Sequence, residues 1–183
     1  FEVLRAWLDK VTLTDTDGKT TYDRTAQDVK FNNWQAGLMK IETTAKQLDE
    51  NGGASEDELT VGFTGTLTDN TLSVKYAGEY TIKVSLISNN YDWKPEEGVQ
   101  QSHDPISFTY TVNKAKIEFD WSTDASSQQF IPAQNQIFPT ATATGIALAD
   151  GITLTVGVYD KSDKLIGNAP DPGVIAAGKF NLK

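Results

Sequence analysis

The sequence predicts an all-β protein made of two β-sandwich domains in tandem, and three observations support this fold class. Short runs in which apolar and polar residues alternate occur along most of the 183 residues, separated by turn signals roughly every 8–12 residues, as in small sandwiches. Two of these runs meet near residue 113 with opposite phase. Two stretches of the first half also recur in the second half, about one hundred residues further on.

The runs that meet lie at residues 108–112 and 117–121, and each has the period of two expected of a half-buried strand. Their apolar members are Phe108, Tyr110 and Val112 in the first run and Ile117, Phe119 and Trp121 in the second. Because Val112 and Ile117 are separated by an odd number of positions, one continuous strand would point the runs at opposite faces. We therefore predict that each run faces the core of its own domain. The domains are expected at residues 1–113 and 114–183, joined by a short, nearly extended linker.

The first domain begins with two candidate strands. Residues 7–14 form the first, and Asp17-Gly18 after it is a tight-turn signal. The second is expected to end in the alternating Val29 and Phe31.

The rest of the first domain contains one ambiguous segment and three clear ones. Residues 38–48 fit either a short helix or an extended segment, because β-branched residues lower helix propensity. The polar residues 49–58 are expected to form a loop, and strands are expected at 59–63, 71–76 and 79–86. We predict a first core centred on Tyr80, Ile82 and Val84, faced by Leu59, Val61, Phe63, Phe108 and Tyr110.

The second domain is also expected to consist of short strands joined by turns. After the strand that opens it, residues 126–138 are expected to continue the sheet, and Asp150-Gly151 is a hairpin signal. Residues 152–158 alternate as a strand, a short strand is expected at Leu165-Ile166, and residues 177–183 begin a final one.

The internal repeat constrains the fold most. Residues 59–63 match 154–158, and residues 77–83 match 177–183, in the same order. In the first copy about thirty residues after the second motif complete the sandwich, whereas the second copy stops at Lys183. We therefore expect the second sandwich to lack its last strand and to be less stable, or to pair its open edge with a neighbouring molecule.

Composition excludes several classes of function. The chain carries 16 basic and 25 acidic residues, a formal charge of −9, which excludes nucleic acid as a partner. No run approaches the roughly 18 apolar residues of a membrane span, and the N-terminus is no signal peptide, so we expect a fragment of a longer protein. The absence of cysteine excludes disulfides and thiolate metal sites. An acidic, cysteine-free chain rich in Thr, Ser, Asn and Gly is typical of bacterial surface proteins.

The sequence offers one candidate ligand site. Tyr91, Trp93 and His103 lie on a long polar loop and would form an aromatic platform that stacks on sugar rings. The alternative is that Tyr91 and Trp93 fold back and cover the end of the sandwich.

Metal and catalytic sites are not predicted. Asp15-Thr16-Asp17-Gly18 resembles the start of a calcium loop, but residues 19–21 supply none of the further oxygen ligands, which leaves a plain hairpin turn. The acidic residues at 49–50 and 56–58 are expected to be solvated. A single histidine without a partner serine or cysteine motif is no catalytic triad, so we predict neither enzymatic activity nor a cofactor.

Four motifs of the first half resemble a known family. They are Tyr22-Asp23-Arg24-Thr25-Ala26, Ala77-Gly78-Glu79-Tyr80, Asn89-Asn90-Tyr91-Asp92-Trp93 and Tyr110-Thr111-Val112-Asn113-Lys114-Ala115. This pattern is similar to the bacterial immunoglobulin-like repeats of the MBG type, found in long surface proteins and adhesins. Arg24 stands where that family usually has glycine. The second half keeps Ala177-Gly178-Lys179-Phe180 but has Ser127-Gln128-Gln129-Phe130 where the Tyr-Asp motif would fall.

The resemblance implies two tandem immunoglobulin-like sandwiches in an extracellular stalk or adhesin at the cell surface or cell wall, without enzymatic activity. Its partners would be host or cell-surface proteins or glycans, bound through the parent protein. The alternative is a carbohydrate-binding module of a secreted polysaccharide-processing protein. That alternative would gain if Trp34, Trp93 or Trp121 lay together on one open face.

Overall fold

The chain is all-β and divides into two compact units, Phe1–Ala115 (unit 1) and Lys116–Lys183 (unit 2). A computed structural model describes residues 4–14, 18–59, 62–97, 100, 102–122, 137–173 and 180–183. Across these residues, no helix has the length and apolar character needed to cross a membrane.

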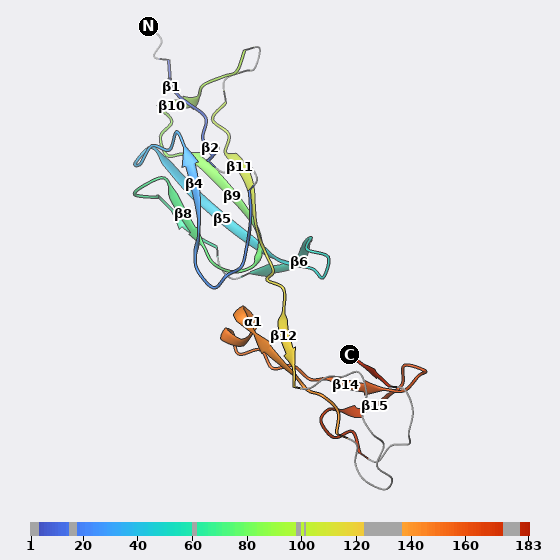
Figure 1. Cartoon of the computed structure of the whole chain (residues 1–183). Coiled ribbons are helices and arrows are strands. Elements are labelled where there is room, and N and C mark those ends of the chain that lie inside the picture. Colours follow the sequence, from blue (N-terminus) through green and yellow to red (C-terminus); the bar gives the residue numbers. More distant parts are fainter. Residues whose placement is uncertain are drawn as a thin grey trace. The chain divides into compact units, whose positions relative to one another are not determined.

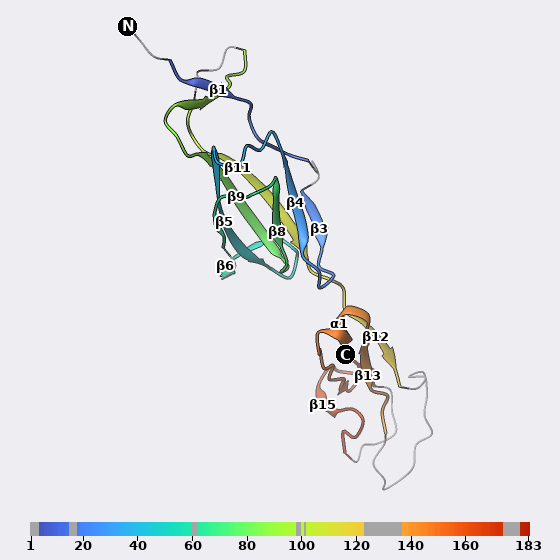
Figure 2. The same ribbon diagram turned by 90° about the vertical axis from the view of Figure 1, so that its left-hand side faces the viewer.

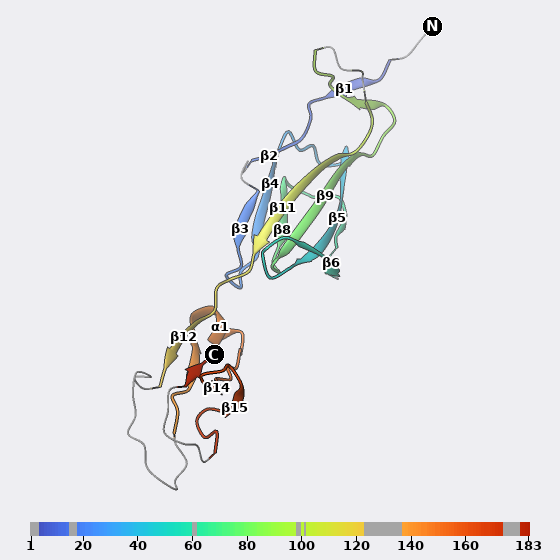
Figure 3. The same cartoon turned by 90° about the vertical axis from the view of Figure 1, so that its right-hand side faces the viewer.

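The described residues of unit 1 form three sheets, and the two main ones share one apolar core. The larger sheet has the order β3-β11-β9-β5-β6, with β7 paired to β5. Its strands are β3 (Lys19–Thr21), β5 (Met39–Leu48), β6 (Ala54–Leu59), β7 (Thr64–Gly65), β9 (Gly78–Leu86) and β11 (Ile106–Asn113). Figure 3 shows β3 and β6 at opposite edges of this sheet, with β11, β9 and β5 between them. The smaller sheet has the order β2-β4-β8. Its strands are β2 (Thr12–Leu13), β4 (Gln27–Asn32) and β8 (Thr71–Val74).

The central strand β9 has the predicted phase. Tyr80, Ile82, Val84 and Leu86 are buried, whereas Lys83 between them is exposed. Its neighbour β11 places Tyr110 opposite Tyr80 and Phe108 opposite Ile82. Both partners belong to the same core or pack against it, as the alternation indicated.

The ambiguous segment 38–48 is the strand β5. Met39, Ile41, Thr43 and Ala45 are buried while the residues between them are exposed, which is the period of a strand rather than of a helix. The smaller sheet closes the core from the other side with Val29 and Phe31 of β4, as predicted.

The segment after β5 differs from the prediction in two respects. Residues 54–58 of the expected polar loop form β6 together with Leu59, because an edge strand tolerates charged side chains on both faces. Phe63 is 40% exposed and does not fill the centre of the core. Leu59 is partly buried and packs against the core, as predicted. Val61 lies outside the described residues.

Two features fix the ends of the sandwich strands. The Tyr80 hydroxyl donates a 2.8 Å hydrogen bond to the carbonyl oxygen of Tyr76, between β8 and β9. The first strand of the large sheet, β3, pairs in parallel with its last, β11, in the register Thr20 opposite Val112.

Unit 2 contains two small sheets and one short helix among its described residues. The first sheet pairs β12 (Glu118–Trp121) with β13 (Ala141–Thr144), and the second has the order β15-β14-β16. Its strands are β14 (Gly157–Tyr159), β15 (Leu165–Asn168) and β16 (Asn181–Leu182). The helix α1 (Gly145–Ala149) directly follows β13, as Figure 2 shows.

The prediction for the run at 117–121 is wrong. Ile117, Phe119 and Trp121 are 41–56% exposed and do not face a core. Alternation shows that the three side chains share a face, but β12 and β13 form a separate two-stranded sheet, and nothing in the sequence pattern says whether that face is covered.

The Asp150-Gly151 signal marks a helix end and not a hairpin. Gly151 has φ of 74°, its N–H donates to the Leu148 carbonyl, and the Ile152 N–H donates to the Ala147 carbonyl. This pair of hydrogen bonds is the Schellman motif that ends many helices. A glycine with positive φ serves a hairpin or a helix end equally, which explains the wrong prediction.

The strands after α1 follow the prediction in part. Of the alternating residues 152–158 only Gly157 and Val158 belong to a strand, β14. Ile152 is exposed, whereas Val156 and Val158 are buried. The short strand predicted at Leu165-Ile166 is part of β15. Residues 126–136 and 177–179 of the other predicted strands lie outside the described residues.

The repeated motifs do not occupy equivalent places in the sheets. In unit 2, Val158 pairs directly with Leu182. In unit 1 the two motifs are not direct neighbours. The first begins at the end of β6, the second lies in β9, and β5 separates these two strands.

Candidate functional site

The three residues of the predicted ligand site lie together at one end of unit 1. Tyr91 and Trp93 belong to β10 (Tyr91–Trp93), which pairs in parallel with β1 (Ala6–Leu8). Figure 1 shows the two strands side by side beyond the main sheets. The Ala6 N–H donates to the Asn90 carbonyl and the Lys94 N–H to the Leu8 carbonyl, which extends the pairing at both ends.

Trp93 is part of the apolar core. Its side chain is nearly fully buried, at 2% exposure, and the indole N–H donates a 2.8 Å hydrogen bond to the Asp104 carbonyl. Tyr91 is partly buried against the same core. The Trp93 ring therefore offers no face for stacking on a sugar, and the arrangement favours the alternative in which the loop aromatics cover the end of the sandwich.

The imidazole ring of His103 contacts β10 through Nδ1. Nδ1 lies 2.7 Å from the Tyr91 carbonyl oxygen and 3.3 Å from Oδ1 of Asp92. A carbonyl oxygen only accepts hydrogen bonds, so Nδ1 carries the proton in this arrangement.

Asp92 is the buried centre of this group. Its side chain is largely withdrawn from solvent, and the Arg5 guanidinium donates to it at 2.8 Å. A buried carboxylate needs such a charged partner, because an unpaired buried charge costs several kcal/mol. Arg5 thus ties β1 to β10 across 87 positions of the sequence. We call Arg5, Asp92 and His103, together with the strands β1 and β10, the β1–β10 clasp.

Exposed ion pairs surround the clasp. The Lys10 ammonium nitrogen lies 3.0 Å from a carboxylate oxygen of Glu96, and that of Lys94 lies 3.5 Å from a carboxylate oxygen of Asp9. Exposed pairs of this kind contribute about 0–1 kcal/mol each. The clasp is therefore held mainly by backbone pairing, by the contact of the buried Asp92 carboxylate with the Arg5 guanidinium, and by the packing of Leu8 and Trp93.

Sequence reasoning missed Arg5 and Asp92. Asp92 lies between two aromatic residues of an extended segment, which is a weak sign of a buried carboxylate. Arg5 carries no local signal, because its partner is remote in sequence.

The structure shows no metal-binding group in the residues it describes, where no cluster of three His, Cys, Asp or Glu could hold an ion. Asp15, Thr16 and Asp17 of the calcium-like sequence lie outside those residues. Asp49 accepts backbone N–H bonds from Asn51 and Gly53, which is ordinary turn chemistry. The other acidic group, residues 56–58, is exposed on β6, in a strand and not in a loop.

The tryptophans named for glycan binding do not gather on an open face of unit 1. Trp34 is partly buried and contacts Phe31 with ring centroids 5.8 Å apart, and Trp93 is buried. Trp121 belongs to unit 2, where it makes an edge-to-face contact with Phe119 at 5.7 Å. The condition set for the carbohydrate-binding alternative is thus not met by Trp34 and Trp93.

Comparisons of the chain with protein-family models, with curated proteins and with solved structures gave no match.

Proposed function

We propose that unit 1 is an immunoglobulin-like sandwich. Three antiparallel pairings support this: β4 with β8, β5 with β9, and β9 with β11. They divide the strands between two sheets in the way the immunoglobulin fold does, with the strand pairs B–E, C–F and F–G. The parallel contact of β3 with β11 adds an early strand of unit 1 to the sheet that contains the last strand of this unit.

The hydrogen bond between the Tyr80 hydroxyl and the Tyr76 carbonyl supports the same proposal. Immunoglobulin-like domains often carry such a tyrosine corner, in which a tyrosine near the start of strand F bonds back to the backbone a few residues upstream. Tyr80 occupies this place at the start of β9. Two positions later Ile82, fully buried, stands where antibody domains have a cysteine.

The motifs shared with the MBG-type repeats have physical reasons in unit 1. Gly78 begins β9, and a Cβ atom there would lie 2.8 Å from the Lys46 carbonyl oxygen and 2.5 Å from a Leu59 methyl group. Only glycine fits without a shift of the backbone. Arg24 has φ of 73°, the conformation that explains why glycine is usual at this position in the resembling repeats.

From this we infer a non-catalytic structural or adhesion module of a bacterial cell-surface or secreted protein, acting as a stalk or a ligand-presenting repeat. The observation that carries the stalk role is the parallel pairing of β3 with β11. The Thr111 N–H donates to the Gly18 carbonyl at 2.8 Å, and the Tyr22 N–H donates to the Asn113 carbonyl at 2.9 Å. When the chain ends are pulled apart, strands paired in this way are sheared, so their hydrogen bonds are loaded together and not one after another.

Single-molecule force spectroscopy on the full chain tests this role. Thr20 lies in register with Val112, and its N–H points toward β11, whereas the N–H of its neighbour Thr21 points away. We expect Thr20→Pro to lower the force at which unit 1 unfolds, because it removes a hydrogen bond from the sheared pair. Thr21→Pro is the matched control and should leave that force nearly unchanged.

Equal unfolding forces for the unmodified chain and Thr20→Pro would overturn the stalk role. Thermal unfolding of the same variants separates a general loss of stability from a loss of resistance to shear, because forced unfolding depends on the unfolding rate.

A further inference from the structure

The sandwich of unit 1 is closed on one side and open on the other. On the closed side the chain passes from β2 in the small sheet to β3 in the large sheet, so one segment joins both edges. On the opposite side the small sheet ends at β8 and the large sheet ends at β6 and β7. These two edges differ in charge. Glu56, Asp57 and Glu58 on β6 repel another copy of the same strand, which is a common protection of sheet edges.

The edge of β8 has no such protection. Its pairing with β4 uses the backbone groups of Asn70, Leu72 and Val74, as the bond from the Phe31 N–H to the Asn70 carbonyl shows. The backbone groups of Thr71, Ser73 and, by alternation, Lys75 point the other way. The Thr71 N–H is bound by the Asp69 carboxylate at 2.9 Å. In the described part of the chain β8 has no neighbour on this side.

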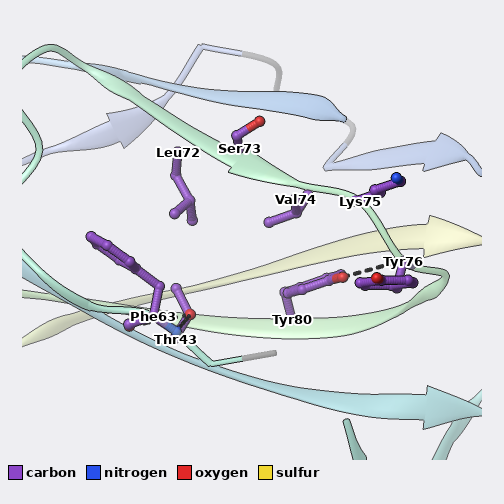
Figure 4. A pocket seen from close by; sticks show the side chains of 8 residues that line it. All are labelled: Thr43, Phe63, Leu72, Ser73, Val74, Lys75, Tyr76 and Tyr80. Atoms are coloured by element: carbon purple, nitrogen blue, oxygen red, sulfur yellow. Dashed lines mark hydrogen bonds between the residues drawn. The ribbon is translucent and has the colours of Figure 1, made fainter. Parts of the chain in front are cut away.

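An apolar cavity of about 170 Å³ lies beneath this edge, between the two sheets. Figure 4 shows Leu72 and Val74 pointing from β8 toward Phe63 and Tyr80. Two of the lining residues are large and solvent-exposed, Phe63 at 40% and Tyr76 at 52%. An added strand would cover this surface, because alternate side chains of a strand bonded to β8 point into the space between the sheets.

We propose that two copies of this chain pair through β8, antiparallel and centred on Ser73, so that their small sheets join. In this register Ser73 of one copy lies opposite Ser73 of the other, and Thr71 lies opposite Lys75. The Ser73 and Lys75 N–H groups donate to the Ser73 and Thr71 carbonyls of the other copy, which gives four backbone hydrogen bonds by symmetry. On the inner face Leu72 meets Val74 of the other copy above the cavity.

Charge favours a second copy as the occupant. Asp69 precedes β8 and Lys75 directly follows it, and the Asp69 carboxylate accepts the Thr71 N–H at the open edge of the strand. In the antiparallel register Thr71 lies opposite Lys75 of the other copy, so the Asp69 carboxylate that accepts the Thr71 N–H is within reach of that long side chain. The edge is thus self-complementary in charge, in contrast to the uniformly acidic β6. The sequence predicted edge-strand self-association for the second domain, whereas this inference places it on β8 of unit 1.

Sedimentation equilibrium of the full chain over a range of concentrations tests the pairing. We expect the average molar mass to rise with protein concentration, from the mass of one chain toward the mass of two. Ser73→Pro should weaken the association by about tenfold or more, because it removes two of the four hydrogen bonds. Proline is tolerated here because the Ser73 N–H is not used within the fold. Ser73→Ala keeps the N–H and should associate like the unmodified chain.

A second variant keeps the test decisive if Ser73→Pro does not fold. Lys75→Glu places a carboxylate beside Asp69 of the other copy and should weaken association several-fold at low salt, more than Lys75→Gln does. The difference between these two variants should shrink as salt rises. A single-chain mass at all concentrations would overturn the proposal. So would a dimer that none of the β8 variants weakens.

Discussion

Arg24 occupies a backbone conformation that its side chain makes costly. Its φ of 73° lies in the left-handed region, where a residue with a Cβ atom is strained by about 1 kcal/mol or more. We expect Arg24→Gly to raise the free energy of unfolding by up to about 1 kcal/mol, since the relief of strain is partly offset by the greater freedom of glycine in the unfolded chain. Urea unfolding measures the change.

Arg24→Ala is the control for this prediction, because it removes the interactions of the guanidinium group while it keeps the Cβ atom. A glycine variant that is no more stable than the alanine variant would show that the left-handed conformation carries no cost at this site.

Tyr80 couples the stability of unit 1 to alkaline pH. Burial of the Tyr80 phenol raises its pKa above the ordinary value of 10.0. The folded-state pKa is therefore higher than the unfolded one, and the associated stability is complete below the unfolded pKa and is lost as pH rises through the folded pKa. We expect unfolding free energy to fall above about pH 10.

Tyr80→Phe should remove this contribution and flatten the alkaline dependence. It should also cost about 0.5–1.5 kcal/mol at neutral pH, because the Tyr76 carbonyl loses its donor. Unfolding curves of the unmodified chain and of Tyr80→Phe between neutral and alkaline pH measure how the unfolding free energy of each depends on pH. Parallel pH profiles for the two would contradict the prediction.

The sequence reveals individual residues only when their chemistry is local. Gly78 and the position of Arg24 stand in short motifs, and their roles follow from backbone sterics within a few residues. Asp92 and Arg5 meet only because β1 pairs with β10, so no window of sequence contains both. Trp93 was a candidate for solvent-exposed stacking because polar residues surround it in the sequence, but the fold buries it.

At the scale of an element, β9 is the strand whose phase the sequence defines best. Ile82 is fully buried at its centre and pairs with both Thr43 of β5 and Phe108 of β11. We expect Ile82→Ala to lower the free energy of unfolding by about 2–5 kcal/mol, the range for large-to-small changes in a core. Its neighbour Lys83 is exposed, so Lys83→Ala is the control and should change stability by about 0.5 kcal/mol or less. Chemical denaturation gives both values, and similar losses for the two variants would mean that the phase of β9 is wrong.

Strands were predictable where they are central and covered on one face. β4, β9 and β11 alternate because one side of each meets the core. Edge elements gave weaker signals. β6 is acidic and reads as a loop, because an edge strand needs no buried face. β12 alternates clearly, yet its apolar side chains are largely exposed. Period two identifies residues that share a face, but only the three-dimensional arrangement determines whether that face is covered.

At the scale of the whole molecule, the two units differ in the apolar core that the described residues show. The continuous core cluster contains seventeen buried residues from Leu8 to Val112, all within unit 1. The buried apolar residues described in unit 2 are Ala143, Ala147, Val156 and Val158. Burial of apolar side chains is the main stabilising contribution to a folded domain, at about 25 cal/mol for each Å² removed from water. Unit 1 therefore has what it needs to fold by itself.

We expect a fragment of residues 1–115 to unfold cooperatively, with a midpoint within a few degrees of the corresponding transition in the full chain. The full chain should show two transitions in differential scanning calorimetry, and the lower one should be absent from the fragment, because unit 2 has the smaller described core. The calorimetric enthalpy of the remaining transition should equal its van't Hoff enthalpy. A fragment that is unfolded at room temperature would show that unit 1 depends on residues 116–183. A full chain that melts in one transition would show that the two units unfold together.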